Sequence, residues 1–427
     1  MAKRSERKHV LPILIVLVLM LLVAVVGALI VRGTGSGKSS TPTTSPPPPL
    51  ATAPGGTGYL HASGVHLLDA SGQAVQLTGL NVEGMESTNT QGSSIPGKCN
   101  SGWKPLSTTE VKLIAGYGFH SVRLPISWGN IEPVAPTTGA GGQLVHQWNS
   151  AYVTALKDEI ALFGQAGIQV VLDMHQSTWG PAFTTPSTSK KPFCPGGGMP
   201  VWLNPRAASE TVGDASCGLL SNHGEPGVPG TPWSNFTTAE AYIDGVFNNN
   251  ATVVGQDVIN EPFCGQGVAD LNGFYTAVAP AIRKVNPNIL IILEDKEDPG
   301  SYLLTKLPNV PNIVLSTHLH QDYWTVPTAG QKSLHYGGQA ALEANVVRSV
   351  QFNVPLYIGE FYAFDGANTQ STNSQTDATW VRDTASFLTY ARQHDISWVY
   401  WSWVQKKKHP EIQSTFPPTV QAALNQR

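Results

Sequence analysis

Short apolar runs rich in β-branched residues recur along the chain from residue 75 onward, and most of them end in polar or aromatic residues. Runs that are apolar throughout, instead of alternating with polar positions, are typical of parallel strands covered on both faces. We predict eight such strands: Val75–Asn81, His120–Ile126, Gln169–Met174, Val253–Ile259, Ile289–Leu293, Asn312–Thr317, Pro355–Gly359 and Ile396–Trp401.

Helical patterns separate these runs. Ser107 with Glu110, and Thr237 with Glu240, have the spacing of capping boxes and predict the starts of two helices. Eight strands alternating with helices indicate an α/β protein with a (β/α)₈ TIM barrel, whose functional residues lie at the C-terminal ends of the strands. An open doubly wound sheet is the alternative, but no glycine-rich phosphate loop follows the first strand.

The first 58 residues have a different character. Basic residues in segment 1–9 precede the uncharged stretch 10–31, which is long enough to cross a bilayer as a helix. We therefore expect a single N-terminal transmembrane signal anchor at 10–31, with the tail 1–9 in the cytoplasm. A cleaved signal peptide is the alternative, and the protein would then be secreted.

Residues 32–58 are rich in Pro, Ser, Thr and Gly and predict a disordered linker. The barrel domain would then span residues 59–427, at the extracellular face of the plasma membrane. The net charge of -3 gives no basic surface for nucleic acid. We expect a monomer whose partners are its substrate and, through the N-terminal helix, the membrane.

Four cysteines, Cys99, Cys194, Cys217 and Cys264, permit two disulfides in an exported chain. Cys194 and Cys217 share one long segment rich in Gly and Pro, Ser177–Ser234, so we expect a bridge between them. The segment follows the third strand and is expected to be an irregular wall over the catalytic face.

Two glutamates follow predicted strands. Glu261 lies in Asn260-Glu261-Pro262, directly after the fourth strand, and Pro262 cannot continue a sheet ladder. Glu360 ends the seventh strand. A carboxyl group in such a place is either part of a structural ion pair or an active-site group. Cleavage of a glycosidic bond needs two of them, one to protonate the leaving oxygen and one to attack the anomeric carbon.

Further motifs stand in order along the chain, among them Val122-Arg123-Leu124-Pro125 and Asp173-Met174-His175-Gln176. With the two glutamates they make the chain resemble glycoside hydrolase family 5, the cellulase-like family, from about Gly79 to Trp403. The resemblance implies a retaining double displacement, with Glu261 as general acid/base and Glu360 as nucleophile.

The same resemblance implies supporting roles for five other residues. Arg123 would support the nucleophile, His175 would face the reacting sugar, and Asn260 would bind the 2-hydroxyl group. His318 would lie on the sixth strand, and Trp401 would form a sugar platform followed by a cis peptide bond.

One position departs from the family pattern, because His320 stands where the family has a tyrosine that hydrogen-bonds the nucleophile. Tyr323 or Tyr362 could supply the missing phenol, or His320 could act itself. A core or surface histidine is the structural alternative for His320.

Several alternatives stay open. A metal-dependent hydrolase could use His318, His320 and His175, but such barrels usually carry His-x-His on the first strand, so we expect neither metal nor cofactor. A non-catalytic carbohydrate-binding surface protein is another. Among substrates, β-1,4-glucan is the first expectation, followed by mannan, other β-glucans and a glycolipid headgroup. Six tryptophans are candidate sugar platforms, with core packing as the alternative: Trp128, Trp179, Trp202, Trp233, Trp324 and Trp403.

Overall fold

The computed structural model describes residues 58–87, 103–176, 198–204, 212–262, 264, 269–295, 303–319, 338–361 and 378–403. The predicted tail 1–9, the anchor 10–31 and all but the last residue of the linker 32–58 lie outside these ranges. Among the helices within them, none is both long enough and apolar enough to span a membrane.

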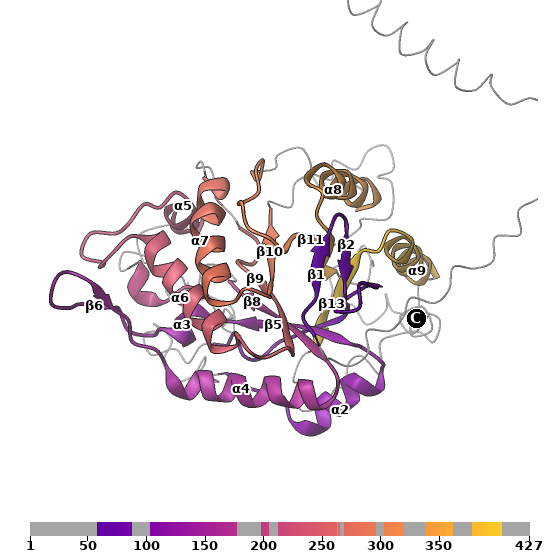
Figure 1. The fold of residues 1–427 in the computed structure, drawn as a ribbon, viewed down its shortest axis with the longest axis horizontal. Coiled ribbons are helices and arrows are strands. Elements are labelled where there is room, and N and C mark those ends of the chain that lie inside the picture. Colours follow the sequence, from indigo (N-terminus) through magenta and orange to yellow (C-terminus); the bar gives the residue numbers. More distant parts are fainter. Residues whose placement is uncertain are drawn as a thin grey trace, which may run out of the picture. The chain divides into compact units, whose positions relative to one another are not determined.

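Eight parallel strands close into a barrel, in the order β10-β11-β12-β13-β4-β5-β8-β9, and helices lie around it (Figure 1). Each of the eight predicted strands overlaps one of them, so the predicted barrel is confirmed. The observed bounds are β4 Thr78–Val82, β5 Ser121–Ile126, β8 Gln169–Met174, β9 Val253–Asp257, β10 Leu290–Glu294, β11 Ile313–Leu319, β12 Leu356–Phe361 and β13 Ser397–Trp403.

The helices between the strands are α2 Thr108–Gly116, α3 Trp128–Ile131, α4 Ser150–Gln165, α5 Val212–Leu220, α6 Pro232–Val246, α7 Leu271–Val285, α8 Gly338–Phe352 and α9 Ala378–Gln393. The capping box of Ser107 and Glu110 begins α2, as predicted. The box predicted at Thr237 and Glu240 is wrong, because α6 starts earlier, at a cap formed by Thr231 and Ser234.

The start of α6 and the helix α5 also correct the prediction for segment 177–234. Pro232 occupies the first turn of α6, where its fixed φ and missing N–H cost little, so the helix begins inside the segment. Helix α5 and the short 3₁₀ helix η2 (Val201–Leu203) lie there too. The described part of the segment therefore contains helices as well as irregular stretches.

One end of the barrel interior is apolar. Strands β1 (His61–Ser63), β2 (His66–Leu68) and β3 (Ala74–Val75) form a small antiparallel sheet. Apolar side chains of this region and of the barrel strands form one buried cluster, which we call the apolar floor: Leu60, Leu67, Val75, Leu77, Val171, Val254, Leu290, Ile292, Val314, Tyr357 and Val399.

Charged side chains follow the apolar floor along the same strands. On β8, Val171 belongs to the floor and Asp173 comes two residues later; on β10, Ile292 is followed in the same way by Glu294. Residues two apart on a strand share a face, so both acidic side chains lie inside the barrel, nearer the C-terminal ends of the strands. Buried Arg123, Asp173, Asp257 and Glu294 form what we call the charged layer.

Candidate active site

Arg123, fully buried on β5, lies at the centre of the charged layer. Its side-chain nitrogens lie 2.9 to 3.1 Å from oxygens of Asn81, Asp173, Asp257, Asn260, Glu294 and Glu360. Burial alone would lower the pKa of Arg123, but the four acidic groups among these raise it well above its usual value. The guanidinium therefore stays charged and fixes side chains from several strands in one arrangement.

Glu261 follows β9 with a left-handed backbone, at φ 43°. This conformation costs a residue other than glycine roughly 1–2 kcal/mol. Hydrogen bonds hold it: the N–H of Glu261 donates to Glu294 Oε2 at 2.7 Å, and Gln176 Nε2 donates to the carbonyls of Asn260 and Glu261 at 2.9 and 3.1 Å. The turn leaves the Glu261 side chain 41% exposed at the mouth of the barrel.

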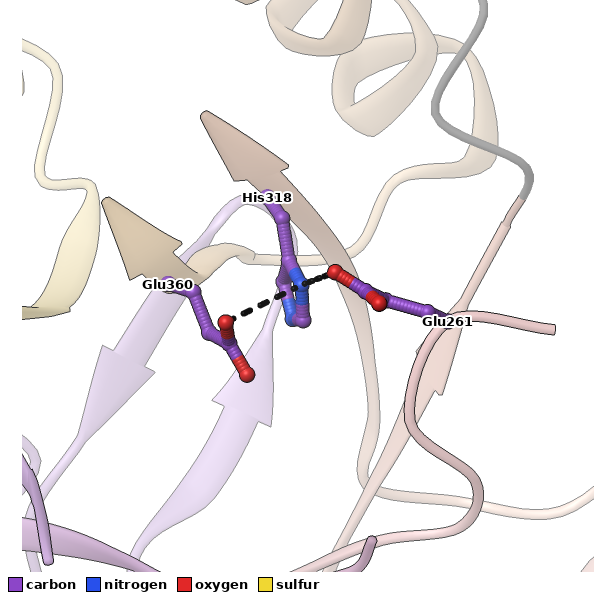
Figure 2. Close-up of side chains that lie close together, drawn as sticks. All are labelled: Glu261, His318 and Glu360. Carbon is purple, nitrogen blue, oxygen red and sulfur yellow. Dashed lines mark hydrogen bonds and ion pairs between the residues drawn. The ribbon is translucent and has the colours of Figure 1, made fainter. Parts of the chain in front are cut away.

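Glu360 and His318 face Glu261 across this mouth (Figure 2). The register between β11 and β12 shifts after Thr317, so that His318 pairs with Glu360. His318 Nδ1 lies 3.0 Å from Glu261 Oε1 and 3.8 Å from Glu360 Oε2. One side-chain atom from each of the three residues lies within 4.8 Å of the other two.

The second ring nitrogen of His318 also faces a carboxylate. Its Nε2 lies 2.9 Å from Glu294 Oε1, as an ion pair and not as a well-aligned hydrogen bond. Burial alone would lower the pKa of His318, but Glu294 and Glu360 raise it well above its usual value. We therefore treat His318 as an imidazolium that donates from Nδ1 to Glu261.

His175 and Trp401 form another side of the site. The two rings stack with centroids 5.5 Å apart and planes 14° from parallel, and His175 Nδ1 lies 2.7 Å from Asp173 Oδ2. Burial alone would lower the pKa of His175, but Asp173 raises it to about 9. The peptide bond from Trp401 to Ser402 is cis, as the family resemblance predicted, and Ser402 Oγ donates to Glu83.

Cations and acidic groups meet in and around the charged layer. Three cations, Arg123, His175 and His318, lie among the buried acidic residues Asp173, Asp257, Glu294 and Glu360. Burial, reinforced by Glu294, raises the pKa of Asp257 well above its usual value. The pKa of Glu294 is lowered: burial alone would raise it, but His318 outweighs that effect. A proton is therefore expected on Asp257.

The donor atoms of Glu261, His318 and Glu360 are close enough together to suggest a metal ion. A histidine that binds a metal must offer a nitrogen lone pair to it, whereas both ring nitrogens of His318 face carboxylates. The three side chains therefore fit an imidazolium between acids better than a metal centre. The other histidine of the metal alternative, His320, lies outside the described residues.

The structure brings together seven of the predicted site residues at the C-terminal ends of the barrel strands: Arg123, His175, Asn260, Glu261, His318, Glu360 and Trp401. Asn260 accepts from Arg123 Nη2 and donates to the carbonyl of Gln176 at 3.2 Å. The predicted residues Tyr323 and Tyr362 are, like His320, not among those described.

Sequence reasoning missed Glu294, Asp257 and Asn81. The signal for Glu294 was available, because it directly follows the fifth apolar run just as Glu360 follows the seventh. Asn81 ends the predicted first strand. It accepts from Arg123 and donates to the carbonyl of Gly359 at 2.9 Å, which ties β4 to β12.

Most of the described tryptophans pack in the core. Trp128 is fully buried and Trp403 nearly so, while the indole N–H groups of Trp202 and Trp233 bond to backbone carbonyls. Core packing therefore accounts for these four. Trp179 and Trp324 lie outside the described residues.

The preferred disulfide pairing is wrong, because Cys217 of α5 is bonded to Cys264. Proximity along the chain misled the prediction: the barrel brings α5 next to the segment that follows Glu261, 47 residues further on.

A parallel eight-stranded barrel with two glutamates facing each other at the ends of its fourth and seventh strands has the pair of carboxyl groups that a glycosidase needs. The family described as Cellulase (glycosyl hydrolase family 5) matches residues 68–407, and the chain belongs to this family.

The chain is similar to an endoglycoceramidase, an endogalactoceramidase and an endoglucanase. An endoglycoceramidase of Hydra vulgaris is 26% identical over 230 residues, which cover 44% of this chain and 41% of that protein. The chain thus spans less than half the length of this relative. A crystal structure of an endogalactoceramidase is 25% identical with a TM-score of 0.61, over 82% of this chain and 75% of the other.

Two further structures share the fold. Endo-glycoceramidase II from Rhodococcus sp. is 19% identical with a TM-score of 0.61, covering 86% of this chain and 81% of its own. An endoglucanase of Pseudomonas stutzeri is 16% identical with a TM-score of 0.53, covering 82% and 94%.

Proposed function

We propose that the protein is a retaining glycosidase that releases the glycan of a glycolipid, with Glu360 as nucleophile and Glu261 as general acid/base. The observation that carries the chemistry is the juxtaposition of Glu261, His318 and Glu360, with an atom of each within 4.8 Å of the others. Carboxyl groups about 5–5.5 Å apart suit direct attack on the sugar, whereas inverting enzymes need about 6.5–9.5 Å to admit a water molecule.

In the first step, a carboxylate oxygen of Glu360 attacks the anomeric carbon while Glu261 gives its proton to the departing oxygen. Arg123 Nη1, 2.9 Å from Glu360 Oε1, keeps Glu360 ionised and oriented. In the second step, Glu261 takes a proton from water, and the resulting hydroxide attacks the anomeric carbon and frees Glu360. The sugar is released with its original anomeric configuration.

The choice of a glycolipid rests on the relatives. Two matches of at least 25% identity are named as an endoglycoceramidase and an endogalactoceramidase. The similarity to an endoglucanase is weaker in both identity and TM-score, which makes β-1,4-glucan the second candidate. Mannan stays a further candidate.

An enzyme acting on membrane lipids would gain from being held at a membrane. We propose that residues 10–31 anchor the chain and that the linker 32–58 lets the barrel reach headgroups in the outer leaflet. Resistance of the full-length chain to carbonate extraction from membranes would support the anchor, and its appearance in the soluble fraction would refute it.

The function is tested with the full-length protein and a panel of glycosphingolipids, β-glucans and mannans, by mass spectrometry of the released glycans. Intact glycan released from a glycosphingolipid is the expected result, and cleavage of glucan alone would refute the glycolipid assignment. A 2-deoxy-2-fluoro glycoside should label Glu360 covalently. Wild-type rates in Glu360→Gln would refute the nucleophile.

A further inference from the structure

Glu294, the last residue of β10, contacts the machinery around both proposed catalytic carboxyl groups. It is 2% exposed. Its Oε2 accepts from the N–H of Glu261 at 2.7 Å, and its Oε1 lies 2.9 Å from Arg123 Nη2 and 2.9 Å from His318 Nε2. The Glu294 side chain thus contacts the backbone of Glu261, the guanidinium of Arg123 and the ring of His318.

The first contact controls the conformation of Glu261. Its left-handed backbone, at φ 43°, directs the side chain towards His318 and Glu360. The N–H of Glu261 has to find an acceptor in this turn, and Glu294 Oε2 supplies a charged one. Removal of that charge weakens the bond that holds the turn.

The second contact controls which oxygen of Glu261 carries the proton. With both ring nitrogens protonated, His318 donates from Nδ1 to Glu261 Oε1, 3.0 Å away. The acidic proton of Glu261 then belongs on Oε2, the oxygen that His318 does not occupy. In a neutral His318, the carboxylate of Glu294 would keep the single N–H on Nε2, and Nδ1 could no longer donate to Oε1.

We propose that Glu294 is a positioning residue for proton transfer: it fixes the turn of Glu261 and, through His318, reserves Glu261 Oε2 for the departing oxygen. This inference rests on the proposed acid/base role of Glu261. It adds a residue of the fifth strand to a site whose predicted members came from other strands.

The test compares two leaving groups on aryl β-lactosides and β-cellobiosides, using the full-length chain. A 2,4-dinitrophenolate departs without protonation, whereas a phenolate needs the acid. In Glu294→Gln, kcat/KM should fall for the phenyl substrate more than for the dinitrophenyl substrate. The difference between the two losses should be about tenfold or more. Glu294→Asp keeps the charge and should recover part of this difference.

Two other variants make the result interpretable. Glu261→Gln should show the same preference for the dinitrophenyl leaving group, more strongly. Asp295→Asn changes the next residue, a buried acid that accepts from the N–H groups of Leu303 and Leu304 and pairs with Arg348. Because these partners lie outside the site, any loss in Asp295→Asn should be equal for both leaving groups.

The outcomes separate the two hypotheses. Equal losses on both substrates in Glu294→Gln, with the preference intact in Glu261→Gln, would overturn the positioning role alone. If Glu261→Gln also lacks the preference, the acid/base assignment itself fails.

A second readout does not depend on activity. In ¹⁵N NMR titrations, with the His318 signals identified by their loss in His318→Asn, Glu294→Gln should lower the pKa of His318 by about one unit or more. An unchanged titration of His318 would overturn the inference.

Discussion

Arg123 Nη1 lies 2.9 Å from Glu360 Oε1, and both side chains are buried. In Arg123→Lys the charge remains, but an ammonium cannot reproduce the planar fork that serves oxygens on several strands. Because a displacement of about 1 Å can cost about 10²-fold in rate, we expect kcat to fall by about that factor. Steady-state kinetics and urea unfolding measure the losses of activity and stability separately.

The control for this variant is Arg283→Lys. Arg283 of α7 also binds several oxygens, but these are the backbone carbonyls of Asn286, Ile289 and Pro311, away from the charged layer. We expect Arg283→Lys to lower the free energy of unfolding and to leave kcat nearly unchanged. Equal kcat values for the two variants would contradict the role given to Arg123.

Gly359 lies where a side chain would strike the site. A Cβ atom there would come within 2.9 Å of His318 Nε2 and 3.0 Å of Ser316 Oγ. Gly359→Ala should displace His318 and lower kcat by about tenfold or more, since overpacking costs about 1–3 kcal/mol. Exposed Gly116, at the end of α2, has no atom within 4 Å of such a Cβ. Gly116→Ala should therefore raise the free energy of unfolding by about 0.5 kcal/mol.

Asp244 of α6 makes the stability depend on pH. It is fully buried, and burial raises its pKa from 3.8 to about 8. The folded protein thus retains a proton that the unfolded chain releases above about pH 4. The stabilising contribution is complete below pH 4 and is lost as the pH rises through about 8.

Asp244→Asn should flatten this fall, because an amide does not ionise. We expect the variant to lose less free energy of unfolding than the wild type between pH 5 and pH 8, measured by urea unfolding. Asp158→Asn, at an exposed position of α4, provides the control. Parallel pH profiles of wild type and Asp244→Asn would show that Asp244 is already ionised in the fold.

The Cys217–Cys264 disulfide ties α5 to the segment that begins three residues after Glu261. Replacing both cysteines with serine should lower the free energy of unfolding by about 2–4 kcal/mol. Loss of the tether also frees the turn at Glu261, so kcat should fall at temperatures well below the melting transition. Unaltered kcat with lowered stability would limit the disulfide to a structural role.

The sequence predicted the barrel because each strand is a continuous apolar run with a clear end, and covering helices leave the strands no polar face. It predicted Glu261 and Glu360 because a carboxyl group at the end of such a run is costly unless it is paired or functional. Glu294 follows the same rule. It was missed because its partners, Arg123 and His318, are brought to it only by closure of the barrel.

Local patterns were less reliable where two of them competed. Thr237 and Glu240 have the spacing of a capping box, but Thr231 offers a cap with proline in the next position, and the longer helix buries Glu240 against the barrel. Likewise, the nearer cysteine was not the partner of Cys217. Such choices are decided by tertiary packing, which a sequence window does not contain.

The apolar floor closes the barrel interior beneath Arg123 with buried hydrophobic side chains. Val171, Ile292 and Val399 are fully buried there, so the field of the buried ions is poorly screened on that side. A low-dielectric base of this kind concentrates the potential towards the opening, where the proposed acid Glu261 lies. The rate of the chemical step should accordingly vary little with ionic strength.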